Sequence, residues 1–198
     1  IPLDISNGSA DFLILSSHKI GGPKGAGAIV AASNLMMPAA LIPGGGQEHG
    51  HRAGTENVAA IAGFGAAARE AAATLAAMDA VRTMRDGIEA EIEGLAPDAI
   101  FYGHGAQRLP NTICFSLPGL KAETAQIAFD LAGVALSAGS ACSSGRVGPS
   151  HVLKAIGHDG EGGLRVSIGP GTAPSDIELF RKALEGIVAR RNAKKEAA

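Results

Sequence analysis

The sequence has few cysteines and little excess of charge of either sign. Its 198 residues include only Cys114 and Cys142, too few for a disulfide framework, so we expect a reducing, cytoplasmic environment. The formal net charge is −2, which gives no reason to expect nucleic acid or an anionic membrane surface as a partner. A small-molecule substrate is therefore the favoured kind of ligand.

Long hydrophobic runs and several well-known catalytic patterns are also missing. No uninterrupted apolar run reaches the roughly 18 residues of a membrane helix, so no membrane segment is expected. The chain has no dinucleotide-binding glycine fingerprint, no ordered Ser-His-Asp set and no histidines at metal-ligand spacing. It does not begin with methionine and opens a few residues before a predicted core strand. We therefore expect it to be the back part of a longer protein.

The order of apolar patterns predicts an α/β chain with two domains. A chain of this length can bury about 70% of its unfolded surface. Residues 1–78 form the first predicted domain, which ends in an alanine-rich helix beginning near Thr55, and residues 79–198 form the second. The elements expected in order are strands at 12–15 and 28–32, helices from 55 and over 79–95, a strand at 112–117, a helix at 121–132, a strand at 134–136, a helix at 149–156, a strand at 164–168 and a last helix opened by a Ser175/Glu178 capping box.

The stretch from Asp11 to Gly27 is the first candidate for chemistry. Its apolar run 12–15 predicts a strand buried on both faces. Ser16, Ser17, His18 and Lys19 follow directly, at the end of a strand where ligands of α/β sheets bind. A lysine held there suits a Schiff base, and the hydroxyls and imidazole can donate to a phosphate. The alternative is a solvated lysine in an ordinary glycine-rich turn.

Three further features stand out in the second half of the first domain and in the second domain. The loop 44–57 is dense in glycine and polar residues, which favours a functional loop. Cys142 lies among small residues, so its thiol is either idle and exposed or able to carry sulfur, whereas Cys114 lies within a strand and is predicted to be structural. Arg165 alternates with apolar residues of its strand, and it either holds a carboxylate through two hydrogen bonds or is solvated at an edge.

Four motifs, taken together, resemble one enzyme family. They are Ser-Ser-His-Lys-Ile-Gly-Gly-Pro-Lys-Gly at 16–25, the glycine-rich loop at 44–57, Ser-Ala-Gly-Ser-Ala-Cys-Ser-Ser-Gly at 137–145 and Leu-Arg-Val-Ser-Ile-Gly at 164–169. In order and spacing they resemble the class V aminotransferase-like cysteine desulfurases of the iron–sulfur cluster assembly and nitrogen-fixation type. The resemblance implies the C-terminal part of a fold-type I pyridoxal-phosphate transferase: the end of the large-domain sheet, a long linking helix and a small α+β domain.

The resemblance also implies a role for each matching residue. Lys19 would form the Schiff base with pyridoxal 5′-phosphate, while Ser16, Ser17 and His18 would hold its phosphate. Thr55 would reach the cofactor of a second subunit, which implies a homodimer. Arg165 would bind the carboxylate of L-cysteine, and Cys142 would take its sulfur as a persulfide, leaving L-alanine.

Partners and metals follow from the same resemblance. A sulfur acceptor or an iron–sulfur scaffold protein would receive the persulfide sulfur. No resident metal is expected, and Cys142 is the candidate for a ligand shared with a partner's iron–sulfur cluster.

Two rival functions stay open at this stage. A selenocysteine lyase or another class V aminotransferase would keep Lys19 and Arg165 but would not need Cys142. The family's ring-stacking histidine and its aspartate that pairs with the ring nitrogen lie upstream of the lysine, and this chain does not contain them. The isolated chain is therefore expected to be inactive, and a non-catalytic interaction domain is the second rival.

Overall fold

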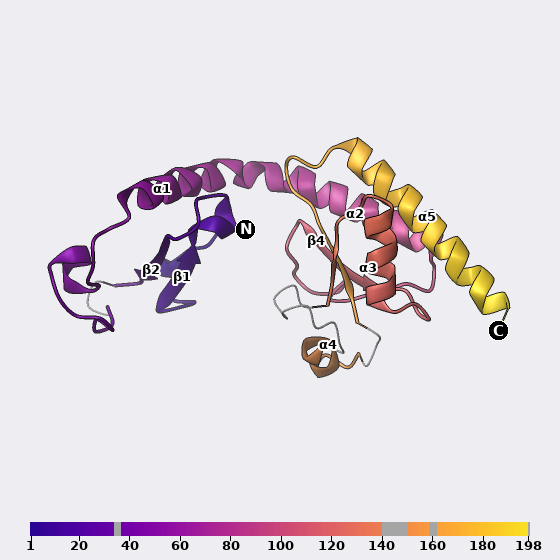
Figure 1. Cartoon of the computed structure of the whole chain (residues 1–198), viewed down its shortest axis with the longest axis horizontal. Helices are drawn as coiled ribbons and strands as arrows, with labels where there is room; N and C mark the ends of the chain where they lie inside the picture. The colour runs from indigo at the N-terminus through magenta and orange to yellow at the C-terminus, as the bar shows by residue number, and fades with distance from the viewer. Residues whose placement is uncertain (34–36, 140–149, 159–161, 198) are drawn as a thin grey trace. The chain divides into compact units, whose positions relative to one another are not determined.

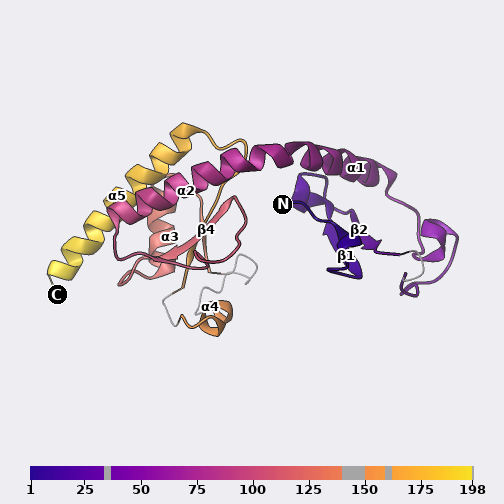
Figure 2. The ribbon, with the colours of Figure 1, turned by 180° about the vertical axis from the view of Figure 1, so that it is seen from behind.

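A computed structural model describes residues 1–33, 37–139, 150–158 and 162–197 of the chain. The chain separates into two compact units, Ile1–Ala76 and Ala77–Ala198, whose ribbons are seen from two sides in Figures 1 and 2. The mixture of strands and helices confirms the predicted α/β class. The domain boundary predicted after residue 78 stays a prediction.

The first unit contains a two-stranded antiparallel hairpin. Strands β1 (Phe12–Ser16) and β2 (Gly27–Ala31) pair along their whole length, from Phe12 opposite Ala31 to Ser16 opposite Gly27. This pairing confirms the predicted hairpin. The expectation that β1 is buried on both faces is wrong for this chain, because the side chain of Ile14 is 83% exposed.

Short 3-10 turns and a helix are also described in the first unit. The turns are η1 (Ile5–Asn7), η2 (Ser17–Ile20) and η4 (Gln47–Gly50), and the helix is α1 (Val58–Ala73). Helix α1 begins after Asn57, whose side chain accepts a hydrogen bond from the Ala60 amide at 3.2 Å and so caps the helix. A Cβ at Gly63 would lie 2.8 Å from Pro23 Cγ, so this glycine lets α1 pack closely on the turn that follows η2.

Helix α1 continues through η5 (Thr74–Ala77) into α2 (Met78–Leu95). By length and composition alone, the stretch Val58–Leu95 would suffice to cross a membrane, with a mean hydropathy of 1.2 in its most apolar window. From the sequence we expected no membrane segment, because no uninterrupted apolar run is long enough to cross a membrane. Only 6% of that window is buried in the structure, and a single helix of this kind is weak evidence for a membrane span.

The second unit is built on a four-stranded antiparallel sheet. Its strands are β3 (Ile100–Phe101), β4 (Thr112–Ser116), β5 (Ser137–Ala138) and β6 (Leu164–Ser167), in the order β3-β4-β6-β5. Strands β4 and β6 alternate between buried and less buried side chains, which confirms two half-buried strands. The predicted strand at 134–136 is wrong, because pairing with β6 begins only at Ser137.

Helices α2, α3 (Ala122–Leu131) and α5 (Pro174–Glu196) enclose the core of this unit, and the short α4 (His151–Ala155) precedes β6. Helix α5 packs on both α2 and α3, which in turn contact β4 and β6 (Figure 1). The core side chains of α5 are those that the sequence pattern selects, including Phe180, Leu184 and Ile187.

The start of α5 differs from the predicted capping box. Its N-cap is Ala173, with Pro174 in the first turn, and the Asp176 carboxylate accepts a hydrogen bond from the Ala173 amide at 2.8 Å. The Ser175/Glu178 box is therefore wrong. Glu178 instead forms an ion pair with Arg181 one turn later.

Candidate functional site

The polar group predicted after the first strand lies at the end of β1. Strand β1 ends at Ser16, and the chain turns at once into η2, which carries Ser17, His18 and Lys19. Gly21 closes this turn in the left-handed region, at a φ of 86°, where glycine avoids the steric cost of a side chain. The sequence Ser-Ser-His-Lys-Ile-Gly thus folds locally into a strand end followed by a tight turn.

Two of these side chains are hydrogen-bonded to one another. The Ser16 hydroxyl and His18 Nδ1 lie 3.0 Å apart, and His18 is exposed. Lys19 is exposed as well, and its amine takes part in no hydrogen bond or ion pair with another residue that the structure describes. A hydroxyl, an imidazole and a primary amine therefore occupy one accessible strand end, which is a donor set suited to an anionic carbonyl compound.

Ser17 is placed differently from its neighbours. It is fully buried, and its hydroxyl has no hydrogen-bond partner within residues 1–33, 37–139, 150–158 and 162–197. A Cβ at Gly22 would lie 2.2 Å from this hydroxyl oxygen, so glycine is required at position 22. The structure thus leaves His18 and Lys19 exposed, places Ser16 half-buried beside His18, and buries Ser17.

Thr55 lies in the exposed segment that leads into α1. Upstream of it, Arg52 donates hydrogen bonds from Nη1 to the carbonyl oxygens of Ala53 and Gly54 and forms an ion pair with Glu48 at 3.6 Å. Arg52 therefore holds the end of the glycine-rich loop in shape. Nothing within the described ranges joins Thr55 to the end of β1 by a hydrogen bond.

Arg165 lies on an inner strand of the second unit. Strand β6 sits between β4 and β5, so Arg165 is half-buried and is not an edge residue. Its Nη2 donates to the Ser137 hydroxyl at 3.4 Å, and its Nε is buried without an acceptor among the residues that the structure describes. An unpaired Nε on a guanidinium is what a carboxylate can engage with two parallel hydrogen bonds.

Ser137 and Cys114 are the two neighbours of Arg165 that the sequence did not connect with it. Both lie opposite Arg165 in the ladders of β5 and β4. Burial raises the pKa of the Cys114 thiol, and the positive charge of Arg165 partly counteracts that effect. Only the strand register could have revealed these pairs, and the sequence contains no local signal for it.

Cys142 lies outside the described residues. Of the other predicted site residues, Ser16, Ser17, His18, Lys19 and Thr55 belong to the first unit, and Arg165 belongs to the second. Within the described ranges, no three histidine, cysteine, aspartate or glutamate side chains gather as they would around a metal ion.

Comparison with known proteins gives one consistent family. A family model described as aminotransferase class-V matches residues 1–180. A cysteine desulfurase of Enterobacter agglomerans is 36% identical over 193 residues, which are 96% of this chain and 48% of that relative. The cysteine desulfurase IscS of Dictyoglomus turgidum is 38% identical over 192 residues, 95% of this chain and 48% of that relative. The chain thus spans about half the length of the curated relatives it matches.

Solved structures agree with the sequence relatives. The X-ray structure of a NifS-like protein from Rickettsia africae matches with a TM-score of 0.81 and 33% identity, over 94% of this chain and 50% of that one. A second NifS-like protein matches with a TM-score of 0.79 and 28% identity, over 96% of this chain and 49% of that one. These matches confirm the fold expected from the four motifs.

Proposed function

The chain belongs to the class V aminotransferase family, and on that premise we propose that it is part of a pyridoxal-phosphate-dependent cysteine desulfurase like the relatives it resembles. It would contribute the lysine that binds the cofactor and the arginine that binds the substrate carboxylate. The reaction proposed for the whole protein converts L-cysteine and an enzyme thiol into L-alanine and an enzyme persulfide. One sulfur atom moves from carbon to sulfur, so atoms balance without a further reactant.

The end of β1 fits the cofactor of the family. Pyridoxal phosphate carries a phosphate and an aldehyde, and the exposed donor set holds a hydroxyl and an imidazole for the first and a primary amine for the second. Ser16 and His18 would hold the phosphate, and Lys19 would hold the aldehyde carbon. Ser17, buried beneath Gly22, would support the turn and is the least accessible member of the predicted set.

Arg165 and Cys142 would bind the substrate and accept its sulfur. When bound, the cofactor supplies an electron sink for the carbanion at the substrate Cα. Arg165 would fix the cysteine carboxylate through Nε and Nη, with Ser137 holding the guanidinium from the other side. Cys142 would accept the substrate sulfur. We propose L-cysteine over selenocysteine because the chain carries a cysteine in the loop motif that resembles the persulfide loop.

Assembly and partners are part of the same proposal. Thr55 would contact the cofactor of a second subunit, so the active form would be a homodimer. The persulfide would pass its sulfur to an acceptor or an iron–sulfur scaffold protein, in the cytoplasm. The exposed position of Thr55 at the end of the loop held by Arg52 supports this role.

A single observation carries the proposal: the exposed Lys19 follows the hydrogen-bonded Ser16–His18 pair at the end of β1, in a chain whose relatives are cysteine desulfurases. The test is Lys19→Ala in the complete enzyme, with Lys24→Ala as the matched control, because Lys24 is an exposed lysine of the same turn. We expect Lys19→Ala to stop sulfide release from cysteine and Lys24→Ala to leave it within twofold. If Lys19→Ala released sulfide as fast as Lys24→Ala, Lys19 would not be the reacting amine.

A further inference from the structure

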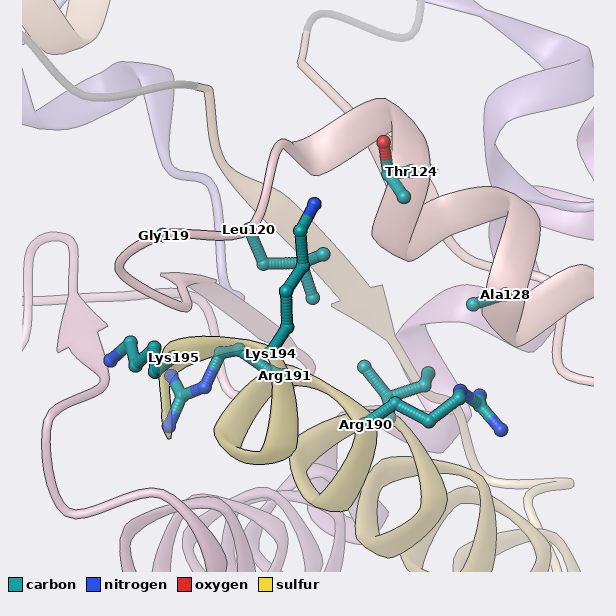
Figure 3. Close-up of a pocket in the computed structure, with 9 residues that line it drawn as sticks. Gly119, Leu120, Thr124, Ala128, Arg190, Arg191, Lys194 and Lys195 are labelled. Atoms are coloured by element: carbon teal, nitrogen blue, oxygen red, sulfur yellow. The ribbon is translucent and has the colours of Figure 1, made fainter. Parts of the chain in front are cut away.

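A basic pocket lies in the second unit, between α3, α5 and the turn before α3. It has a volume of about 440 Å³, within the range of small-molecule sites. Figure 3 shows the side chains around it. The lining residues are Gly119, Leu120, Thr124, Ala128, Ile187, Arg190, Arg191, Lys194 and Lys195.

The charges at this pocket do not cancel. Four of the lining residues are cationic and none is acidic. The nearby Asp98 carboxylate pairs with Arg191 Nη2 at 2.8 Å and with Lys195 Nζ at 3.0 Å. Arg190 and Lys194 have no ion-pair partner in the part of the chain that the structure describes. Two positive charges one helical turn apart are therefore uncompensated.

Arg191 provides a separate sign that an acceptor is missing. The residue is 7% exposed, and its Nη1 is buried with no hydrogen-bond partner in the described part of the chain. Leaving a buried charged donor unpaired is costly, so such groups are normally satisfied. Arg191 lines the same pocket as the two uncompensated cations.

The remaining walls are apolar. Leu120, Ala128 and Ile187 contribute hydrocarbon surface, and Thr124 adds one hydroxyl across from α5. In Figure 3, Lys194 extends from α5 past Leu120, with its amine on the side of Thr124. A ligand that fits this combination has an anionic head and an apolar body.

We propose that this pocket binds a small organic phosphate, a phosphomonoester dianion carried on an apolar body. The two negative charges match Arg190 and Lys194, and a guanidinium recognises phosphate oxygens through two parallel hydrogen bonds. The apolar body would cover Leu120 and Ala128. All lining residues belong to the second unit, so the site is separate from the proposed cofactor group at the end of β1 and does not depend on the proposed desulfurase activity.

The experiment titrates phenyl phosphate into the whole chain and follows the backbone amides by NMR. Inorganic phosphate, which lacks the body, and benzoate, which has the same ring but a single charge, are titrated alongside. The test variant is Arg190→Gln/Lys194→Gln. The control variant is Arg69→Gln/Lys154→Gln, which removes the same two charges from residues outside the pocket.

We expect saturable shifts at Gly119, Leu120 and Thr124, with phenyl phosphate binding at least tenfold more tightly than inorganic phosphate or benzoate. The test variant should weaken phenyl phosphate at least tenfold and the control variant less than twofold. Equal binding of phenyl and inorganic phosphate, or equal losses in both variants, would show a general charge effect and overturn the proposal. Shifts confined to Ser16 and His18 would assign binding to the proposed cofactor group and also overturn it.

Discussion

Arg165 and Cys114 lie directly opposite one another on the neighbouring antiparallel strands β6 and β4. Burial raises the pKa of the Cys114 thiol above its usual range, and this effect outweighs the lowering by the Arg165 charge. Since the thiolate is the reactive form of cysteine, Cys114 is a poor nucleophile near neutral pH. The cysteine beside the proposed substrate arginine is therefore not suited to accept sulfur.

The first prediction contrasts the two cysteines. In the complete enzyme, Cys142→Ala should abolish persulfide formation, because the proposed sulfur acceptor is lost, while bound cofactor, read from its visible absorbance, is retained. Cys114→Ala should retain at least half of the persulfide, because we expect this half-buried thiol to have a structural role. The measurement is persulfide labelling after incubation with L-cysteine.

Two outcomes would contradict the roles assigned to Cys142 and Cys114. Full persulfide labelling in Cys142→Ala, with loss in Cys114→Ala, would move the acceptor role to Cys114. Full sulfide release by Cys142→Ala without any persulfide would favour a lyase that needs no acceptor cysteine.

The second prediction concerns Arg165. Arg165→Lys should raise KM for cysteine by tenfold or more with a smaller change in kcat, because a two-bond guanidinium fork becomes a single point charge. Such a loss corresponds to about 1.5 to 3 kcal/mol. Steady-state kinetics of the complete enzyme measure it. The control is Lys154→Gln, which changes an exposed cation of the same unit. If Arg165→Lys and the control had the same KM and kcat, Arg165 would not bind the substrate carboxylate.

The sequence predicted the elements whose signals are local. The hairpin β1–β2 follows from two apolar runs on either side of a Gly-Pro turn. The polar end of β1 and the alternation in β4 and β6 were also readable, because each depends on neighbours within a few residues. The start of α5 was misplaced although Pro174, a residue favoured in the first helical turn, marked it.

Features that depend on distant partners could not be predicted. Strand β5 contains two residues, and its position is set by pairing with β6 rather than by its own pattern. The contact between Ser137 and Arg165 spans 28 positions of sequence and exists only in the folded register. Likewise, the apolar composition of β1 does not show whether other residues cover Ile14, and its side chain is 83% exposed in the structure.

The third prediction tests the contact of Asp98 with α5. Asp98 binds Arg191, whose side chain is 4% exposed, and the more exposed Lys195. Asp98→Asn should lower the free energy of unfolding by about 1 to 2 kcal/mol. The buried Arg191 guanidinium loses its charged partner, whereas the loss of the exposed ion pair with Lys195 contributes little. Urea unfolding measures the change. Glu178→Gln, which removes an exposed pair of the same helix, should have a smaller effect.

The stability that the Asp98 carboxylate contributes should decrease at acidic pH. The hydrogen bond from Lys195 is the largest of the causes that lower the pKa of Asp98 below its ordinary value of 3.8. A carboxyl group with a lowered pKa in the folded state stabilises the fold above its unfolded pKa and loses that contribution as pH falls through the folded value. The difference between wild type and Asp98→Asn should therefore be constant above about pH 5 and shrink below pH 3.8. A difference that grew on acidification would contradict this assignment.

The last prediction concerns the 198-residue chain on its own. In the part of the first unit that the structure describes, two strands pair with each other, and Ile14 and Ile29 are 83% and 52% exposed. An isolated hairpin is marginal in water, whereas the second unit has a four-stranded sheet with a continuous core. Amides of β1 and β2 should therefore exchange with solvent much faster than those of β4 and β6, as hydrogen exchange with mass spectrometry would measure.

Because the chain matches only 48% of the length of each of two cysteine desulfurase relatives, we also expect weak, non-stoichiometric pyridoxal phosphate binding and no alanine formation from cysteine by the chain alone. Adding a polypeptide with the other half of a relative's length should slow exchange in β1 and restore alanine formation. Stoichiometric cofactor with turnover by the chain alone would refute this account.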